Sequence, residues 1–192
     1  MSVEILAQEV SAKQKSHGSQ YYREAIGKLQ RVMPGVFIDA AVSLTDEVLM
    51  QIISTRQPDI VMNLISALSY HKMTTQIPAY LSVSAPKGAY IPKVFACPVK
   101  VWGCKPEYLL YGCEKKNGTY GEYKVTTPER TLVDCFRYRN KIGIDIFLEA
   151  LSLGLNKKII NLTSLAEIAR FFRVERNMMP YIRTAYISIF VS

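Results

Sequence analysis

Apolar residues recur at two different spacings along this chain, and the spacing separates helical from strand-like segments. Between Val3 and about Lys13, and again in QYYREAIGKL at residues 20–29, apolar positions lie three or four apart, which predicts two amphipathic helices. The run KQKSHGSQ between them is typical of a turn. Short β-prone runs then flank the turn dipeptide Pro34-Gly35, so the first 44 residues predict two helices and a small hairpin.

The following residues predict further helices and a group of strands. SLTDEVLMQIIS predicts a helix that Ser43 or Thr45 can cap, and PDIVMNLISALSYHKMT predicts a second helix. Five β-rich runs separated by turn residues predict strands, namely AYLSVSA, KVFAC, VKVWG, YLLYGC and YGEYKVTT. Asn117-Gly118 is a strong hairpin signal before the last of these runs. Helical spacing returns in the tail, in IDIFLEALSLGL, LTSLAEIARFFR (with a capping box from Ser164 to Glu167) and NMMPYIRTAYISIF.

These elements predict an α+β fold in two parts. Residues 1–44 have the element order of a reduced, partial winged helix-turn-helix, in which the second helix enters the major groove and the hairpin touches the DNA backbone. Residues 45–192 predict an α+β domain with an antiparallel sheet followed by C-terminal helices.

The stretch VTTPERTLVDCFRYRNKIG at residues 125–143 concentrates charge in a way that a helix explains. Thr126 and Glu129 match a capping box, and Pro128 fits the first helical turn. Arg130 and Asp134 are one turn apart and can pair. The stretch contains no nucleophile beside a base and no metal-ligand spacing, so we expect a helix with a basic C-terminal end rather than a catalytic centre.

The net charge of +8 points to an anionic partner, nucleic acid above all. Residues 1–44 carry five Lys and Arg against four acidic residues, whereas residues 45–192 carry nineteen against twelve. A basic face is therefore expected on the larger part of the chain. The residues that we expect to form it are Lys72, Arg137, Arg139 and Lys141.

The spacing of the cysteines indicates whether the chain could bind a metal ion, and the length of the apolar runs indicates whether it could span a membrane. The four cysteines form no CxxC pair, and two histidines add little, so we predict no metal site and no cofactor, with free and mostly buried thiols. The apolar runs are shorter than the roughly 20 residues of a membrane helix. Charge at Glu4 and Glu9 interrupts any signal peptide. We expect a cytoplasmic protein without a membrane partner.

Three blocks together resemble the AbiEi family of antitoxins from type IV toxin–antitoxin (abortive-infection) systems. They are LISALSYHKMTTQIPAYLSVSAPKG, VTTPERTLVDCFRYRNKIGIDIFLEAL and LAEIARFFRVERNMMPYI, and the resemblance covers about residues 45–185. It implies a non-enzymatic protein in which an N-terminal winged helix represses the protein's own promoter. A C-terminal domain would counteract a nucleotidyltransferase toxin, without necessarily forming a stable complex with that toxin.

The same resemblance assigns DNA contacts to the N-terminal segment. SQYYREAIGKL would be the recognition helix and QRVMPGVFID the wing, although only two helices fit before Gln30 where a complete winged helix has three. The implied partners are promoter DNA and the cognate toxin or its nucleic-acid target, and the resemblance leaves a homodimer open. The implied DNA-binding residues are Ser19, Gln20, Tyr21, Arg23, Lys28 and Arg31.

Three other functions stay open from the residues alone. Asp59, Glu122 and Lys124 imitate the PD…ExK pattern of a nuclease, but an Asp that caps a helix and a paired strand face explain them more simply. Trp102 and many tyrosines could stack on RNA bases if they lay exposed beside Lys100, Lys105 or Lys124. A protein-binding module would instead show an exposed apolar patch.

Overall fold

A computed structural model describes residues 27–190 of the chain. Two strands come first, β1 (Leu29–Met33) and β2 (Val36–Asp39), and then α3 (Asp46–Ser54). The remaining strands are β3 (Val61–Met62), β4 (Leu81–Pro86), β5 (Val99–Cys104), β6 (Cys113–Gly118) and β7 (Gly121–Thr126). The remaining helices are α4 (Leu64–Tyr70), α5 (Pro106–Leu109), α6 (Pro128–Arg137), α7 (Arg139–Ile142), α8 (Ile144–Asn156), α9 (Leu162–Phe171) and α10 (Glu175–Phe190).

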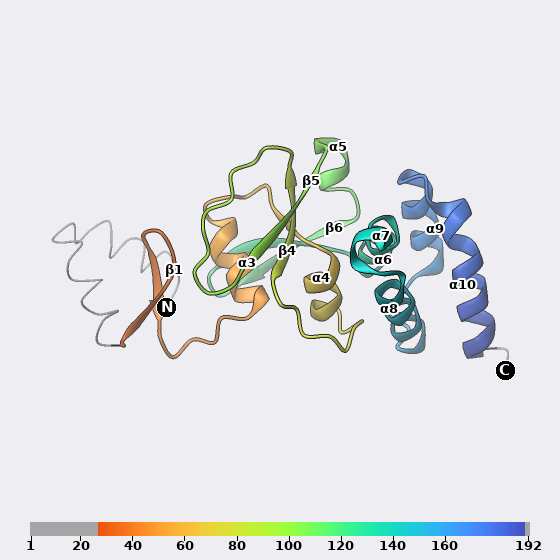
Figure 1. Ribbon diagram of the computed structural model, residues 1–192, viewed down its shortest axis with the longest axis horizontal. Coiled ribbons are helices and arrows are strands. Elements are labelled where there is room, and N and C mark those ends of the chain that lie inside the picture. Colours follow the sequence, from red (N-terminus) through yellow and green to blue (C-terminus); the bar gives the residue numbers. More distant parts are fainter. Residues whose placement is uncertain (1–26, 191–192) are drawn as a thin grey trace.

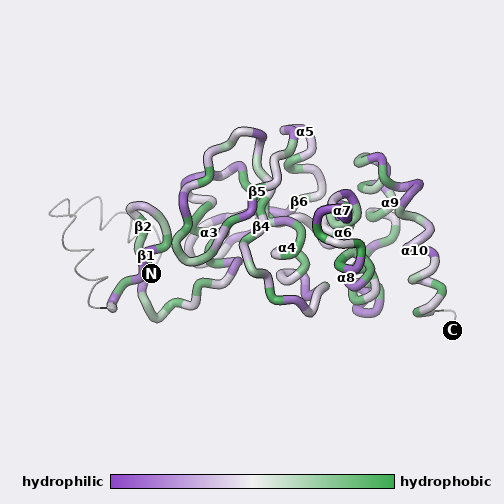
Figure 2. The backbone as a smooth tube through the Cα atoms, in the orientation of Figure 1, coloured by the Kyte–Doolittle hydropathy of each residue, from purple (hydrophilic) through white to green (hydrophobic). Residues whose placement is uncertain are grey.

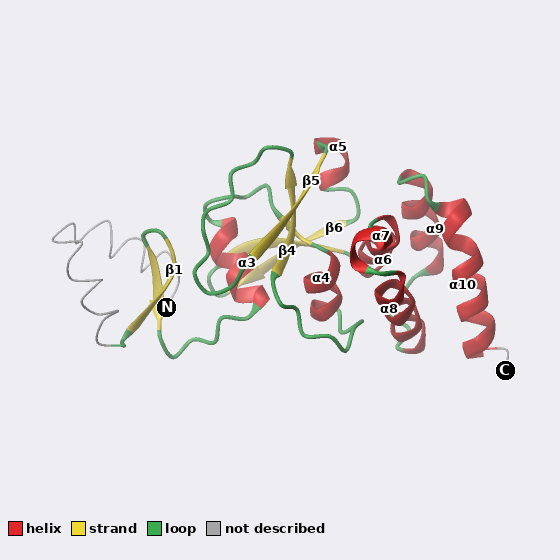
Figure 3. Cartoon of the chain, viewed as in Figure 1, coloured by secondary structure: helices red, strands yellow, loops and turns green. Residues whose placement is uncertain are grey.

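The described elements lie in three regions along the longest axis of the molecule (Figure 1). The β1–β2 hairpin is at one end, a sheet with α3 and α4 is in the middle, and α6 to α10 form a helical layer at the other end. Figure 3 shows no strand within this helical layer. The predicted α+β class is therefore confirmed for residues 27–190.

The main sheet has five strands in the order β5-β4-β3-β7-β6. The prediction of an antiparallel sheet was wrong, because β3 pairs with β7 and β4 pairs with β5 in parallel, while only β3–β4 and β6–β7 are antiparallel. Parallel pairs need long crossovers, and β3 and β7 are more than fifty residues apart in the chain. The sheet is therefore mixed.

The hairpin predicted around Pro34-Gly35 is present as β1 and β2, with Gly35 at a φ of +71° in the turn. Its buried residues belong to the same core cluster as α3: Val32, Met33 and Ile38 pack with Leu49 and Met50. The division of the chain at residue 44 stays a prediction, while in the described part the hairpin and α3 share one core.

Three segments differ from their predicted type. Residues 58–63 were expected to be helical, but Val61 and Met62 form the central strand β3, because a short apolar run fits a buried strand as well as a helix. Asp59 consequently lies in a turn and not at a helix start.

The segment KVFAC, predicted as a strand, is a loop that makes one backbone contact with the hairpin, from Phe95 N to the carbonyl oxygen of Val32 at 2.8 Å. YLLYGC contains the end of α5, a helix that begins at Pro106.

Two helix caps lie apart from the predicted capping boxes. The N-cap of α6 is Thr127 and not Thr126, and its hydroxyl accepts from Arg130 N at 3.2 Å. Glu129 does not complete the box, because its carboxylate accepts from Asn161 N at 2.8 Å and so joins α6 to the start of α9. The N-cap of α9 is Asn161 rather than Ser164. Thr45 caps α3 as predicted.

Two hydrophobic cores hold the described chain together. One lies between the sheet, α3 and the hairpin, and the other lies among α4, α6, α8, α9 and α10 around Phe136, Phe147 and Leu151. Figure 2 shows hydrophobic and hydrophilic residues alternating in short runs along the coloured part of the tube. Within residues 27–190 no helix is long and apolar enough to span a membrane.

Candidate nucleic-acid interface

Cations and aromatic rings gather where the edge strand β5 meets the end of α6 and α7. The Lys100 ammonium lies 4.8 Å from the ring centroid of Trp102, and the Lys141 ammonium lies 5.8 Å from the same ring. Tyr138 packs against Trp102 at a centroid distance of 4.6 Å. Arg137 lies 5.6 Å from the Tyr138 ring. We call Lys100, Trp102, Arg137, Tyr138 and Lys141 the basic-aromatic cluster.

The local sequence explains how this cluster forms. Lys100 and Trp102 are two residues apart on β5, so their side chains leave the sheet on the same face. Tyr138 and Lys141 lie at the junction of α6 and α7, which packs against that face. The sequence analysis did not predict that Tyr138 belongs to this site. The alternation in VKVW, however, does indicate that Lys100 and Trp102 lie on the same face of a strand.

The two lysines of the cluster are not neutralised from within the described chain, whereas Arg137 pairs with Asp134. In residues 27–190 Lys100, Lys141 and the neighbouring Arg139 form no ion pair. Arg139 donates to the carbonyl oxygen of Phe136 at 2.7 Å and covers its ring. Lys100 and Lys141 are exposed, so their ammonium groups can reach phosphate oxygens.

Trp102 is held in place by a buried chain of hydrogen bonds. Its indole Nε1 donates to Ser82 Oγ at 3.0 Å, and Ser82 Oγ donates to Asn63 Oδ1 at 2.8 Å. Asn63 Nδ2 donates to Ser84 Oγ at 2.6 Å. Asn63 directly after β3 and Ser82 on β4 thus fix the position of the Trp102 ring, which both lysines contact.

The four residues expected to form one basic face are divided between two places. Lys157, which follows α8, donates to the carbonyl oxygen of Lys72 at 2.7 Å. Arg139 and Lys141 precede the first residue of α8, and a helix of 13 residues is about 20 Å long. Lys72 therefore lies beyond the opposite end of α8, apart from Arg137, Arg139 and Lys141.

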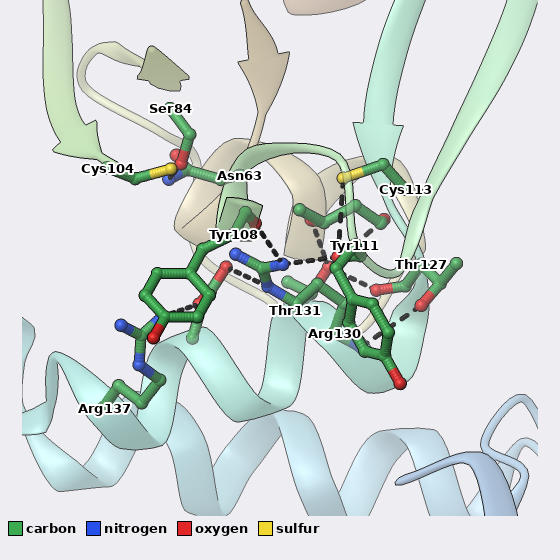
Figure 4. A network of polar contacts seen from close by, with 12 residues as sticks. Asn63, Ser84, Cys104, Tyr108, Tyr111, Cys113, Thr127, Arg130, Thr131 and Arg137 are labelled. Atoms are coloured by element: carbon green, nitrogen blue, oxygen red, sulfur yellow. Dashed lines mark hydrogen bonds and ion pairs between the residues drawn. The ribbon is translucent and has the colours of Figure 1, made fainter. Parts of the chain in front are cut away.

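Arg137 contacts the Tyr138 ring of the cluster and also belongs to a polar network in the interior, which Figure 4 shows together with Arg130. It pairs with Asp134 at 2.9 Å, and Asp134 also accepts from Arg130 Nε at 2.8 Å, which confirms the predicted pair on α6. Arg130 is buried and donates to the carbonyl oxygens of Tyr108 and Tyr111. This network joins α6 to the α5 segment, so Arg130 has a structural role.

Of the residues implied in DNA binding, the structure describes only two. Ser19, Gln20, Tyr21 and Arg23 lie outside the described residues. Lys28, predicted to lie in the recognition helix, is instead exposed in a bend directly before β1, and Leu29 is already part of that strand. Arg31 is half-buried, with its guanidinium 4.6 Å from the centroid of Phe95, so it fastens the hairpin to the loop before β5.

The residues of the nuclease pattern are engaged in other contacts. Lys124 Nζ donates to the carbonyl oxygen of Pro58 at 2.7 Å, and Glu122 pairs with Lys115. Across residues 27–190 no group of three or more His, Cys, Asp and Glu side chains could hold a metal ion.

The aromatic residues proposed for stacking are mostly part of the cores. Trp102 and Tyr123 are buried, whereas Tyr90 is 72% exposed. Tyr111 stacks on Phe171 at 3.8 Å and lies against α9. Trp102 is only 7% exposed and packs against Tyr138, so little of its ring is open to a base.

Burial makes the thiols unreactive at neutral pH. Cys135 is fully buried, whereas Cys97, Cys104 and Cys113 are only partly buried, so the predicted burial holds fully for one of them. Burial raises the pKa of Cys113 to about 12 and raises the pKa values of the other three as well.

His71 is the C-cap of α4, and its side chain makes one specific hydrogen bond. Its Nε2 lies 2.7 Å from the carbonyl oxygen of Thr126, so Nε2 carries the proton. Burial lowers the pKa of His71 below 6.5, and the Thr126 bond opposes this in part.

Stability should therefore fall as the pH is lowered through the His71 pKa. The neutral ring is favoured in the folded state, so its contribution is complete above pH 6.5, falls as the unfolded chain takes up a proton, and is fully lost below the lower pKa of the folded protein. We expect His71→Gln to flatten the change in the free energy of unfolding between pH 7.5 and 5.5, measured by urea titration. An unchanged pH profile in His71→Gln would show that other groups cause the dependence.

No family model matches the sequence, and no curated protein matches it at significant similarity.

Proposed function

We propose that this chain is a non-enzymatic, nucleic-acid-binding regulator and antitoxin of the AbiEi type. The observation that supports this most is the basic-aromatic cluster, in which Lys100 and Lys141 form no ion pair within residues 27–190 and lie 4.8 and 5.8 Å from the Trp102 ring centroid. Phosphate contacts by lysine and arginine provide most of the affinity of such proteins. The residues that we expect to contact phosphate are Lys100, Arg137, Arg139 and Lys141, with Lys28 on the hairpin.

In this proposal the N-terminal segment reads promoter DNA and the cluster adds affinity. The hairpin would serve as the wing, and the basic-aromatic cluster would engage DNA or the nucleic-acid target of a nucleotidyltransferase toxin. Antitoxin action without a stable complex fits a surface that recognises nucleic acid rather than a protein.

The test is binding of the full chain to duplex DNA from its own upstream region at several salt concentrations. Loss of two phosphate contacts in Lys100→Ala/Lys141→Ala should reduce the slope of log affinity against log salt by about 1.8 and weaken binding about tenfold. Lys157→Ala/Lys158→Ala, which removes the same charge beyond the far end of α8, is the matched control. Equal losses in both double variants would exclude a specific interface at the cluster.

The antitoxin part of the proposal needs a separate readout. Co-expression with a candidate nucleotidyltransferase toxin should restore growth with the wild-type chain and restore less growth with Lys100→Ala/Lys141→Ala. Full rescue by this variant would place the antitoxin activity elsewhere in the chain.

A protein-binding module is a second candidate, because α9 and α10 form an apolar groove of about 290 Å³. Leu162, Tyr186 and Ile187 line this groove and are 40 to 57% exposed. Such a patch is typical of a protein contact. A stable complex with a toxin that Ile187→Asp abolishes, together with no salt-dependent DNA affinity, would favour this candidate.

A further inference from the structure

A pocket of about 440 Å³ lies where the end of α3, the turn after it and the β6–β7 hairpin meet. Its size is within the range of small-molecule sites. None of its residues belongs to the basic-aromatic cluster. The pocket is lined by Ser54, Thr55, Pro58, Lys115, Glu122, Tyr123 and Lys124.

Two lysines face each other across the strands of this pocket. Lys115 on β6 and Lys124 on β7 are direct partners in the antiparallel register, so their side chains leave the same face of the hairpin. Like charges directly opposite each other destabilise a strand pair. A ligand with two negative charges between them would turn this repulsion into attraction.

Each ammonium has a partner that an anion can replace. Lys115 pairs with Glu122, and both side chains are about 60% exposed, where ion pairs contribute little. Lys124 Nζ donates to one backbone oxygen, that of Pro58, and an ammonium can donate three hydrogen bonds. Both lysines therefore keep capacity for a charged acceptor.

Ser54 adds an observation that is independent of charge. It is the last residue of α3, it is 8% exposed, and its hydroxyl is buried without a hydrogen-bond partner among the described residues. The hydroxyl of the neighbouring Thr55 donates to the carbonyl oxygen of Ile52 at 2.7 Å. At this helix end the Thr55 hydroxyl therefore has a hydrogen-bond partner and the Ser54 hydroxyl has none among the described residues. Buried hydroxyls usually have a partner, and rotation of the Ser54 side chain toward the pocket would let a ligand oxygen supply one.

We propose that this pocket binds the phosphoryl group of a small ligand, as free phosphate or pyrophosphate or as part of a mononucleotide. Lys115 and Lys124 hold the phosphoryl oxygens from opposite strands, and the Ser54 hydroxyl donates to one of them. Lys115 exchanges Glu122 for the ligand, so Glu122 competes with the anion. The site is independent of the proposed DNA contacts.

The test is isothermal titration of the full chain with pyrophosphate and with AMP at constant ionic strength. We expect saturable binding of one ligand per chain, weakened at least about tenfold in Lys115→Gln/Lys124→Gln. Lys87→Gln/Lys158→Gln changes the net charge equally at exposed positions and should leave the affinity unchanged. Tighter binding of AMP identifies a nucleotide ligand, and binding of pyrophosphate alone identifies a free anion.

Two single variants separate a built site from general charge attraction. Ser54→Ala should weaken binding several-fold without lowering the Tm of the free protein, because the hydroxyl has no partner within residues 27–190. Glu122→Gln should strengthen binding, because it frees Lys115. Equal effects of both lysine pairs, no binding at millimolar ligand, or loss of DNA binding alone in Lys115→Gln/Lys124→Gln would each overturn the proposal.

Discussion

Arg130→Met should lower the free energy of unfolding by about 3 kcal/mol, the low end of the cost of breaking a buried ion pair. Arg130 and Asp134 are both 2% exposed in their side chains, and their contact is 2.8 Å long. Methionine keeps the apolar contact with Phe172, whose ring lies 4.0 Å from the guanidinium. It leaves the carbonyl oxygens of Tyr108 and Tyr111 without their donor.

The loss should not reach the upper end of the range, because Asp134 keeps Arg137 as a partner. Arg130→Met/Asp134→Leu removes both buried charges and should recover part of the stability. Urea unfolding measures these differences, and Arg170→Met is the matched control, because the ion pair of Arg170 with Glu175 is at the surface. Similar losses for Arg130→Met and Arg170→Met would contradict a structural role for the buried network.

The helices of the helical layer were predictable, because the features that define a helix lie within a few neighbouring residues of the sequence. The apolar spacing of IDIFLEALSLGL and LTSLAEIARFFR corresponds to α8 and α9, and the pairing of Arg130 with Asp134 follows from one helical turn. The caps were one to three residues away from their predicted places, because several Thr, Ser and Asn residues compete for each helix start. Tertiary contacts decide between them, as the Glu129 contact with Asn161 shows.

The sheet was less predictable, because its pairing depends on residues far apart in the chain. Val61 and Met62 form a strand of only two residues, and their place between β4 and β7 makes them strand rather than helix. The sequence indicates that VKVWG is a strand, but it does not indicate that this strand runs parallel to β4. The order of the five strands is therefore a result of the packing and not of local preference.

The candidate site was predictable in part for the same reason. Three of the predicted residues are neighbours in the chain and therefore also lie close together in space, namely Arg137, Arg139 and Lys141. Lys72 was predicted from its charge alone, and it lies beyond the opposite end of α8. Lys100 joins the cluster only because β5 is placed against the junction of α6 and α7. A contact between residues some forty positions apart cannot be predicted from the local sequence around either residue.

The buried polar chain behind Trp102 links this packing to the proposed function. Asn63 is fully buried and bonds to both Ser82 and Ser84, which themselves lie in the interior of β4. The next residue, Leu64, is buried with a φ of +45°, a strained conformation for leucine that the surrounding contacts maintain. The junction of β3 and α4 therefore depends on Asn63.

Asn63→Ala should lower the free energy of unfolding by about 2 to 4 kcal/mol, because it leaves two buried hydroxyls without that partner. Trp102 is the single tryptophan of the chain, so a change in its fluorescence reports the loosened ring directly. We also expect weaker DNA binding, since Lys100 and Lys141 are positioned by that ring. Asn156→Ala, at an exposed position, should change none of these readouts. Unaltered fluorescence and stability in Asn63→Ala would show that the hydrogen-bond chain does not hold Trp102.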